Sequence, residues 1–108
     1  MKLWYIYIMS NKLQGVIYVG FTNNLHERVK EHKLKVYPDS FTAKYNCDKL
    51  IYFEEWNDGL EATKREKQLK KWKREWKVSL IEAMNPTWMD ISLNWNFDFE
   101  TIRNKNKY

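Results

Sequence analysis

The chain has 108 residues, 44% hydrophobic and 17% aromatic, which is enough to bury one core and excludes a disordered protein. Its single cysteine excludes an internal disulfide, and no stretch approaches the roughly 20 apolar residues that span a bilayer. We therefore expect a cytoplasmic protein without membrane contact. The net charge of +5 favours a polyanionic partner, although many small basic domains bind no nucleic acid.

The first part of the chain is predicted to form a β-hairpin. Aromatic and β-branched residues favour a strand over 3–9. A polar turn over 11–15 is followed by a second short strand, predicted over 15–20 and ending at Gly20. Two strands joined by a short polar turn pair in antiparallel fashion.

A helix is predicted next, over residues 24–36. Asn24 and Glu27 have the spacing of a capping box, with Asn24 as the N-cap and Glu27 reaching back to it. The run 37–40 contains a proline and ends the helix. The apolar stripe of this helix consists of Leu25, Val29 and Val36.

A third strand and a long helical stretch follow. The strand is predicted over 48–55, and Asp58 with Glu61 repeats the capping-box spacing. The helical stretch covers 59–84, either as one helix or broken near residue 73, and Asn85-Pro86 ends it.

These elements predict an α+β protein, within the broader α/β class. In the order ββαβα(α), they form a small three-stranded, mainly antiparallel sheet flanked by helices. We expect one domain over 1–85 and a tail over 86–108. The segment 103–107 is expected to fray. The aromatic residues predicted to pack the first part of the tail are Trp88, Trp95, Phe97 and Phe99.

Glu66 conflicts with the helical pattern around it. With 3.6 residues per turn, it falls on the stripe formed by Ala62, Leu69 and Trp76. A glutamate is rarely buried unless it is paired or binds a metal. Two interpretations stay open: a functional inward carboxylate, or an ion pair with Lys70 at the edge of the stripe.

His32 shows the same conflict, because it lies on the apolar stripe of its helix. A lone histidine there is usually a core residue with a backbone partner. Arg28, one turn earlier on the same edge, favours a functional role, since an arginine and a histidine aimed at one place suit a phosphate. Tyr5, Tyr7 and Tyr18 lie on the predicted hairpin and, taken singly, are ordinary packing residues.

The second helical stretch carries a dense cluster of basic residues. A run of charges is usually a solvated face, but a helix so one-sided in sign repels itself, which favours contact with a phosphate backbone. The cluster is opposed by Glu66 and Glu75 alone. Its members are Lys64, Arg65, Lys67, Lys70, Lys71, Lys73, Arg74 and Lys77.

Taken together, several of these positions resemble the signature of the GIY-YIG nuclease superfamily. The resemblance covers residues 3 to about 85 and is greatest to small stand-alone bacterial, excinuclease-C-like members. Tyr5 stands in place of the glycine that names the family, and Val19 in place of the second isoleucine. The shared positions are Tyr5-Ile6-Tyr7, Tyr18-Val19-Gly20, Arg28 with His32, and Glu66.

The resemblance implies the GIY-YIG fold and a metal-dependent endonuclease that hydrolyses a phosphodiester bond in DNA. Glu66 would be the sole protein ligand of one Mg²⁺ or Mn²⁺ ion. Tyr18 would activate or orient the attacking water. Arg28 would hold the scissile phosphate and stabilise developing charge.

The remaining roles complete this implied site. Tyr7 would hydrogen-bond into the network, and His32 would position or deprotonate Tyr18. Gly20 would let the backbone pass close to the nucleic acid. The other expected nucleic-acid contacts are Lys64, Lys67, Lys70, Lys71 and Arg74.

Two alternatives stay open. A domain with the same fold that binds nucleic acid without cutting it would use the basic cluster equally well. An interaction protein would use the aromatic tail over 86–108 to bind a partner or to form a homodimer.

Overall fold

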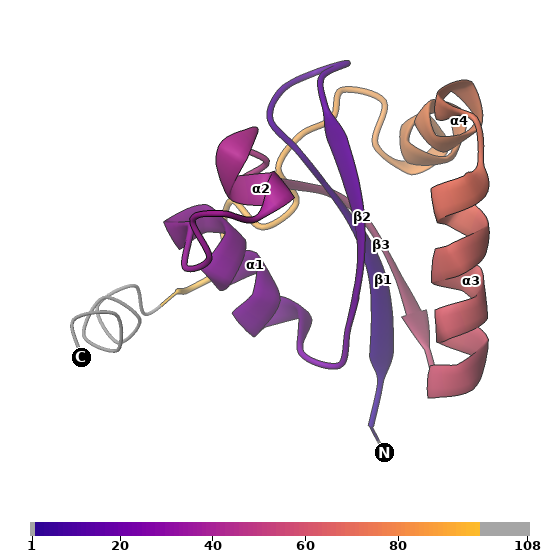
Figure 1. Ribbon diagram of the computed structural model, residues 1–108. Coiled ribbons are helices and arrows are strands. Elements are labelled where there is room, and N and C mark those ends of the chain that lie inside the picture. Colours follow the sequence, from indigo (N-terminus) through magenta and orange to yellow (C-terminus); the bar gives the residue numbers. More distant parts are fainter. Residues whose placement is uncertain (1, 98–108) are drawn as a thin grey trace.

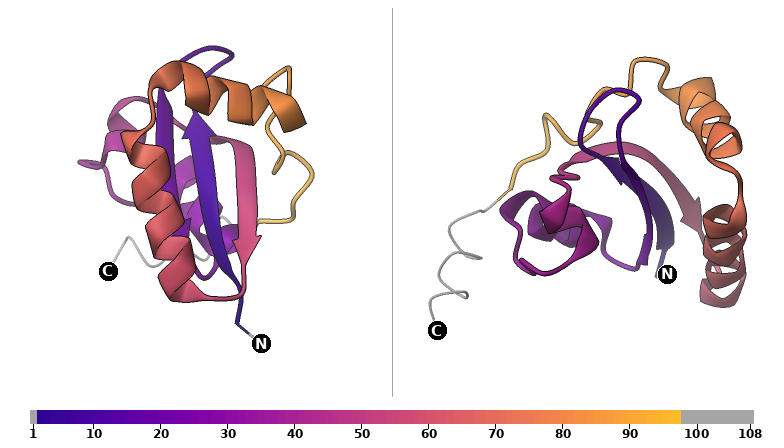
Figure 2. Two further views of the ribbon diagram at one scale, coloured as in Figure 1. Left: turned by 90° about the vertical axis from the view of Figure 1, so that its right-hand side faces the viewer. Right: turned by 45° about the horizontal axis from the view of Figure 1, so that its top comes forward.

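The computed structural model describes residues 2–97 and places a three-stranded sheet between two layers of helices (Figure 1). Helices α1 and α2 cover one face of the sheet, and α3 and α4 cover the other (Figure 2). The predicted α+β fold with an antiparallel sheet is confirmed. The elements are β1 (Trp4–Ser10), β2 (Ile17–Thr22), α1 (Leu25–Leu34), α2 (Phe41–Lys44), β3 (Lys49–Trp56), α3 (Gly59–Lys71) and α4 (Arg74–Met84).

Strand β1 is the centre of the sheet, in the order β2-β1-β3, and both of its pairings are antiparallel. The register between β1 and β3 shifts by one residue between Ile8 and Met9. Such a bulge lets two successive residues of one strand face the same side. Ile51 and Tyr52 of β3 accordingly both join the core beneath α3 and α4.

The sheet separates two apolar clusters because side chains alternate along each strand. Ile6 and Ile8 of β1 point toward α3 and α4, where they form one cluster with Ala62 and Leu69 of α3. The cluster on the other face, beneath α1, contains Tyr7, Met9, Leu25, Val29, Cys47 and Leu50.

Helix α1 begins at the predicted N-cap, where the Asn24 side chain accepts a hydrogen bond from the Glu27 backbone N–H at 3.2 Å. The prediction that Glu27 reaches back is wrong. The Asn24 N–H donates to Thr22 Oγ1 instead, and the Glu27 carboxylate pairs with Lys30. The helix ends at its C-cap Lys35, whose φ of 53° is left-handed, so Val36, which was predicted to belong to the apolar stripe, lies beyond the end of the helix.

The helical stretch after β3 consists of two helices, which is the second of the two possibilities that the sequence left open. The break lies at Trp72 and Lys73. Trp72 and Lys73 are both extended, with ψ of 147° and 149°. The break turns α4 away from α3, so the single stripe predicted through Ala62, Leu69 and Trp76 is wrong: Trp76 is 52% exposed. Asp58 caps α3 as predicted, but Glu61 pairs with Lys64 instead of reaching back.

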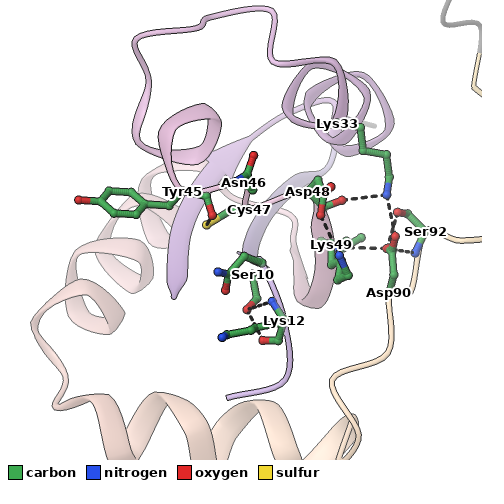
Figure 3. Close-up of polar contacts among 12 residues, drawn as sticks. Ser10, Lys12, Lys33, Tyr45, Asn46, Cys47, Asp48, Lys49, Asp90 and Ser92 are labelled. Atoms are coloured by element: carbon green, nitrogen blue, oxygen red, sulfur yellow. Dashed lines mark hydrogen bonds and ion pairs between the residues drawn. The ribbon is translucent and has the colours of Figure 1, made fainter. Parts of the chain in front are cut away.

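The first part of the tail packs on the same chain. Trp88 is buried in the core beneath α3 and α4, and Trp95 packs on the cluster beneath α1. The Asp90 carboxylate accepts from the Leu50 N–H and pairs with Lys33, which also donates to the Asp48 carbonyl (Figure 3). Trp88 and Trp95 are two of the four aromatic residues predicted to pack in this segment. Phe99 and the segment 103–107 lie outside the described residues.

Within residues 2–97, no helix is long and apolar enough to cross a membrane. Helix α2 was not predicted, because the proline-containing turn before it indicates only a break in the chain. Its first turn is capped by Ser40, which accepts from the Ala43 N–H at 3.3 Å.

Candidate active site

The hairpin register places Tyr7 of β1 directly opposite Gly20 of β2. The Tyr7 side chain is fully buried, and its ring lies against the glycine. A Cβ atom at Gly20 would lie 2.3 Å from Tyr7 Cζ and 2.4 Å from the Tyr7 hydroxyl. Gly20 therefore provides the space that the Tyr7 ring occupies. The contact with nucleic acid expected of Gly20 stays a prediction.

The Tyr7 hydroxyl starts a buried chain of hydrogen bonds. It lies 2.9 Å from His32 Nε2, and His32 Nδ1 lies 2.8 Å from Thr42 Oγ1. Thr42 Oγ1 is in turn 3.3 Å from the Ser40 hydroxyl. One side chain from β1, one from α1 and one from α2 thus fix each other on the α1 face of the sheet.

Burial determines the protonation states of Tyr7 and His32 in this hydrogen-bond network. Desolvation raises the pKa of Tyr7 to about 12, despite the nearby positive charge of Arg28. Desolvation and Arg28 lower the pKa of His32 to about 4. The imidazole is therefore neutral near pH 7, and we assign Tyr7 O–H as the donor to Nε2 and Nδ1–H as the donor to Thr42.

Tyr18 of the edge strand β2 completes an aromatic group around His32. Its ring lies 5.7 Å from the His32 ring in an edge-on arrangement and 6.3 Å from the Tyr7 ring. Both ring nitrogens of His32 are already engaged, so His32 does not hydrogen-bond Tyr18. Within the part of the chain that the structure describes, the Tyr18 hydroxyl has no hydrogen-bond partner.

Arg28 lies one turn before His32 on α1, as the sequence predicts. It pairs with Glu31 at 2.9 Å and lies 5.9 Å above the Tyr37 ring. Its charge opposes the rise in the pKa of Tyr7, which shows that the guanidinium is close to that hydroxyl. The arginine is one-third exposed, so its remaining donors are open to a ligand.

Glu66 lies apart from this group. It belongs to α3, which packs against the opposite face of the sheet, chiefly on β2 and β1. The side chain is 17% exposed and pairs with Lys70 at 3.2 Å, the alternative considered from the sequence. Among residues 2–97 no hydrogen bond or ion pair joins it to the Tyr7 group, but its charge contributes to the raised pKa of Tyr7.

The predicted nucleic-acid contacts on α3 and α4 have different surroundings. Arg74 donates to the backbone carbonyls of Gln14 and Gly15 in the β1–β2 turn, at 3.0 and 2.6 Å. Lys64 pairs weakly with Glu61 at 3.5 Å. The two exposed lysines of α3 without an ion-pair partner among the described residues are Lys67 and Lys71.

Thr42 is the member of the hydrogen-bond network that the sequence did not predict. A serine immediately before an apolar residue is a signal for the start of a helix, and Ser40, which precedes Phe41, carries it. That signal identifies α2, but nothing in the sequence pairs Thr42 with His32. Their contact depends on how α2 folds back over α1.

Within residues 2–97, no three or more His, Cys, Asp or Glu side chains gather in a way that could hold a metal ion. Any metal here would depend on a single carboxylate with water and substrate oxygens as the other ligands. Mg²⁺ often binds in this way, because it keeps several of its waters.

Comparison with known proteins supports the resemblance seen in the sequence. Residues 3–79 match the GIY-YIG catalytic domain. A UPF0213 protein of Clostridium perfringens is 37% identical over 83 residues, covering 73% of this chain and 83% of the relative. A UPF0213 protein of Syntrophus aciditrophicus is 34% identical over 82 residues, covering 76% of this chain and 92% of the relative.

A solved structure has the same fold. The solution NMR structure of a UPF0213 protein from Bacillus halodurans aligns with a TM-score of 0.52 and 21% identity, over 87% of this chain and 99% of that chain. The matched domain spans both strands of the hairpin, α1 and α3, which carry every residue of the predicted signature. The chain therefore belongs to the GIY-YIG superfamily of nucleases.

Proposed function

We propose that the protein is a metal-dependent endonuclease that hydrolyses a phosphodiester bond in DNA. The observation that carries this proposal is the convergence of Tyr7, Tyr18, Arg28 and His32 on one face of the β1–β2 hairpin. A hairpin with only a structural role has no need for a buried phenol–imidazole pair beside an open arginine and a tyrosine hydroxyl without a hydrogen-bond partner among the described residues.

The residues present fit one hard divalent cation, Mg²⁺ or Mn²⁺. Glu66 would hold it, because its carboxylate is largely buried and its partner Lys70 is half exposed and free to move aside. When bound, such an ion supplies a Lewis acid for the phosphoryl oxygen and a more acidic water. The influence of Glu66 on the pKa of Tyr7 supports placing that charge near the hairpin.

The chain's own side chains divide the remaining work. Arg28 would bind the non-bridging oxygens of the scissile phosphate and stabilise the charge that develops on them. Tyr18 would orient the water that attacks phosphorus, since it belongs to the edge strand and its hydroxyl has no hydrogen-bond partner within residues 2–97. As the water oxygen bonds to phosphorus and gives up a proton to solvent, the bond from phosphorus to a sugar oxygen breaks, and that oxygen leaves as a hydroxyl after taking up a proton from solvent.

His32 takes a different part from the one the resemblance implies. With Nε2 accepting from Tyr7 and Nδ1 donating to Thr42, it has no free nitrogen with which to deprotonate Tyr18. We assign it to holding the Tyr7 ring against Gly20. A neutral imidazole beside Arg28 also avoids placing a second positive charge next to the guanidinium.

Long-range attraction of DNA would come from α3. Lys67 and Lys71 are exposed and have no ion-pair partner among the described residues, so their charges are available to phosphates. Lys64 and Lys70 would also contact DNA phosphates once their ion pairs with Glu61 and Glu66 had opened. Arg74 would act indirectly, by holding the β1–β2 turn.

A panel of labelled duplex, branched and single-stranded DNA, incubated with Mg²⁺ and then Mn²⁺, tests this proposal. We expect cleavage of at least one substrate with either ion and none after addition of EDTA. Tyr18→Phe is expected to slow cleavage strongly. Tyr5→Phe is the matched control, because Tyr5 lies on the neighbouring strand and its ring packs against Phe53 rather than His32. Tight DNA binding without cleavage of any substrate would instead identify a binding domain that lacks turnover.

A further inference from the structure

An exposed row of aromatic rings extends from the proposed site onto α2. Phe41 is 44% exposed and Tyr45 is 50% exposed. Phe41 stacks on Tyr18 with ring centroids 6.0 Å apart and an interplanar angle of 28°. Tyr45 lies 4.7 Å from Phe41, at 43°.

The fold of α2 explains why these rings face outward. The one-turn helix buries Thr42 and Ala43, and Thr42 is held by the His32 ring. Phe41 and Tyr45 are four residues apart and therefore share the opposite side of the turn. The hydrogen bond that completes the buried chain thus also fixes the direction of the two exposed rings.

The row is aromatic and carries little net charge. In the segment 35–48, Lys35 and Lys44 are balanced by Asp39 and Asp48. This surface differs from α3, where the exposed lysines gather. A charge-balanced aromatic surface is suited to the flat faces of bases, whereas phosphates require cations such as the adjacent Arg28.

We infer that Phe41 and Tyr45 form a stacking platform for an unpaired nucleobase next to the scissile phosphate. Tyr18 belongs both to the platform and to the site, so a nucleotide whose phosphate contacts Arg28 has its neighbouring base within reach of Phe41. Bases in a continuous duplex are stacked on each other and do not present a free face. The preferred substrate class is therefore DNA with an unpaired segment, an inference that rests on the proposed function.

Binding measured by fluorescence anisotropy in EDTA tests the platform without requiring cleavage. The probes are a labelled single-stranded oligonucleotide, an abasic strand of the same length and a fully paired duplex. The wild-type protein should bind the base-bearing strand about tenfold more tightly than the abasic strand, since stacking of one base on an aromatic ring contributes that much or more.

Variants then assign the difference to the rings. Phe41→Ala and Tyr45→Ala should each remove most of the preference for the base-bearing strand and leave binding to the abasic strand unchanged. Phe41→Leu keeps an apolar contact with Tyr18 without a flat face and should behave like the alanine variant. Trp76→Ala is the matched control, because Trp76 is similarly exposed on α4.

Equal affinity of the wild-type protein for base-bearing and abasic strands would overturn the platform, as would an equal loss on both probes in Phe41→Ala. Self-association of the wild-type protein that disappears in Phe41→Ala would show a protein interface and overturn it too. A protein that prefers bases in EDTA but never cleaves would refute only the proposed function. Cleavage without any preference for unpaired bases would refute only the platform.

Discussion

A single methyl group at Gly20 is expected to destabilise the protein, because Tyr7 occupies the space it would need. The three atoms nearest to an added Cβ all belong to the Tyr7 side chain, at 2.3 to 2.7 Å. The ring cannot swing away freely, since it is fully buried and its hydroxyl is held by His32 at 2.9 Å. No glycine in residues 2–97 has a positive φ, so backbone strain does not contribute.

The size of the effect follows from these contacts. Overpacking a well-filled core costs about 1–3 kcal/mol. Displacing the Tyr7 hydroxyl from His32 adds about 1 kcal/mol for the lost hydrogen bond. Gly20→Ala should therefore lower the free energy of unfolding by about 2–4 kcal/mol, which lowers the melting temperature by about 10 °C or more in a domain of this size.

A second background makes the test decisive. In a Tyr7→Ala protein the clashing ring is absent, and an alanine at position 20 also restricts the unfolded chain. Gly20→Ala should then be neutral or stabilising by up to about 1 kcal/mol. Denaturant unfolding of the wild-type protein, the two single variants and the double variant gives the coupling free energy between positions 7 and 20 directly. If Gly20→Ala cost the same in both backgrounds, or nothing in the wild-type protein, the role assigned to Gly20 would be refuted.

Three further predictions follow from the same surroundings. The pKa of His32 is lowered from 6.5 to about 4, so the neutral imidazole should stabilise the fold fully above about pH 6.5. The free energy of unfolding should fall by about 3 kcal/mol as the pH is lowered to 4. The melting temperature of His32→Gln should depend less on pH, and an unchanged pH-dependence would contradict the argument from burial. Thr42→Val leaves Nδ1–H of the imidazole unpaired and should cost about 1–3 kcal/mol in urea unfolding, whereas Thr42→Ser should cost less. Lys67→Ala and Lys71→Ala should each reduce the slope of log affinity for DNA against log salt concentration by about one, whereas Arg74→Ala should leave this slope unchanged. An equal effect of all three variants would show that Arg74 also contacts phosphate.

Regular patterns in the sequence predicted the backbone well. The hairpin, both helix N-caps and the break near residue 73 depend on local signals: strand composition, side-chain oxygens that accept backbone N–H groups, and spacing. The prediction that Glu27 and Glu61 reach back to their N-caps was wrong, because other side chains bind the groups concerned. At α1 the Asn24 N–H is already bound by Thr22, which leaves Glu27 free to pair with Lys30.

The site was predicted less completely. In the sequence, His32 conflicted with its apolar stripe and Arg28 lay on the same edge of the helix, and the structure brings both to Tyr7. Partners from distant parts of the chain were not predictable, because no spacing rule relates Thr42 to His32. The anchoring of Arg74 on the β1–β2 turn was likewise hidden, since a basic run does not reveal which of its members bind the same chain.

The most direct test of the central claim, that Glu66 holds the ion required for cleavage, compares Glu66→Gln with Glu61→Gln. Both carboxylates lie on α3 and pair with a lysine of the same helix, at 3.2 Å and 3.5 Å. Such helical pairs contribute about 0.5 kcal/mol or less, so neither variant should change the melting temperature greatly. Cleavage rate and melting temperature are to be measured on the same preparations in Mg²⁺, with EDTA as the control.

We predict that Glu66→Gln lowers the cleavage rate by on the order of a thousandfold, because loss of the ion removes several kcal/mol of transition-state stabilisation. Glu61→Gln should cleave at the wild-type rate, and EDTA should abolish cleavage by both the wild-type and Glu61→Gln proteins. Full activity of Glu66→Gln, or wild-type cleavage that persists in EDTA, would contradict the claim.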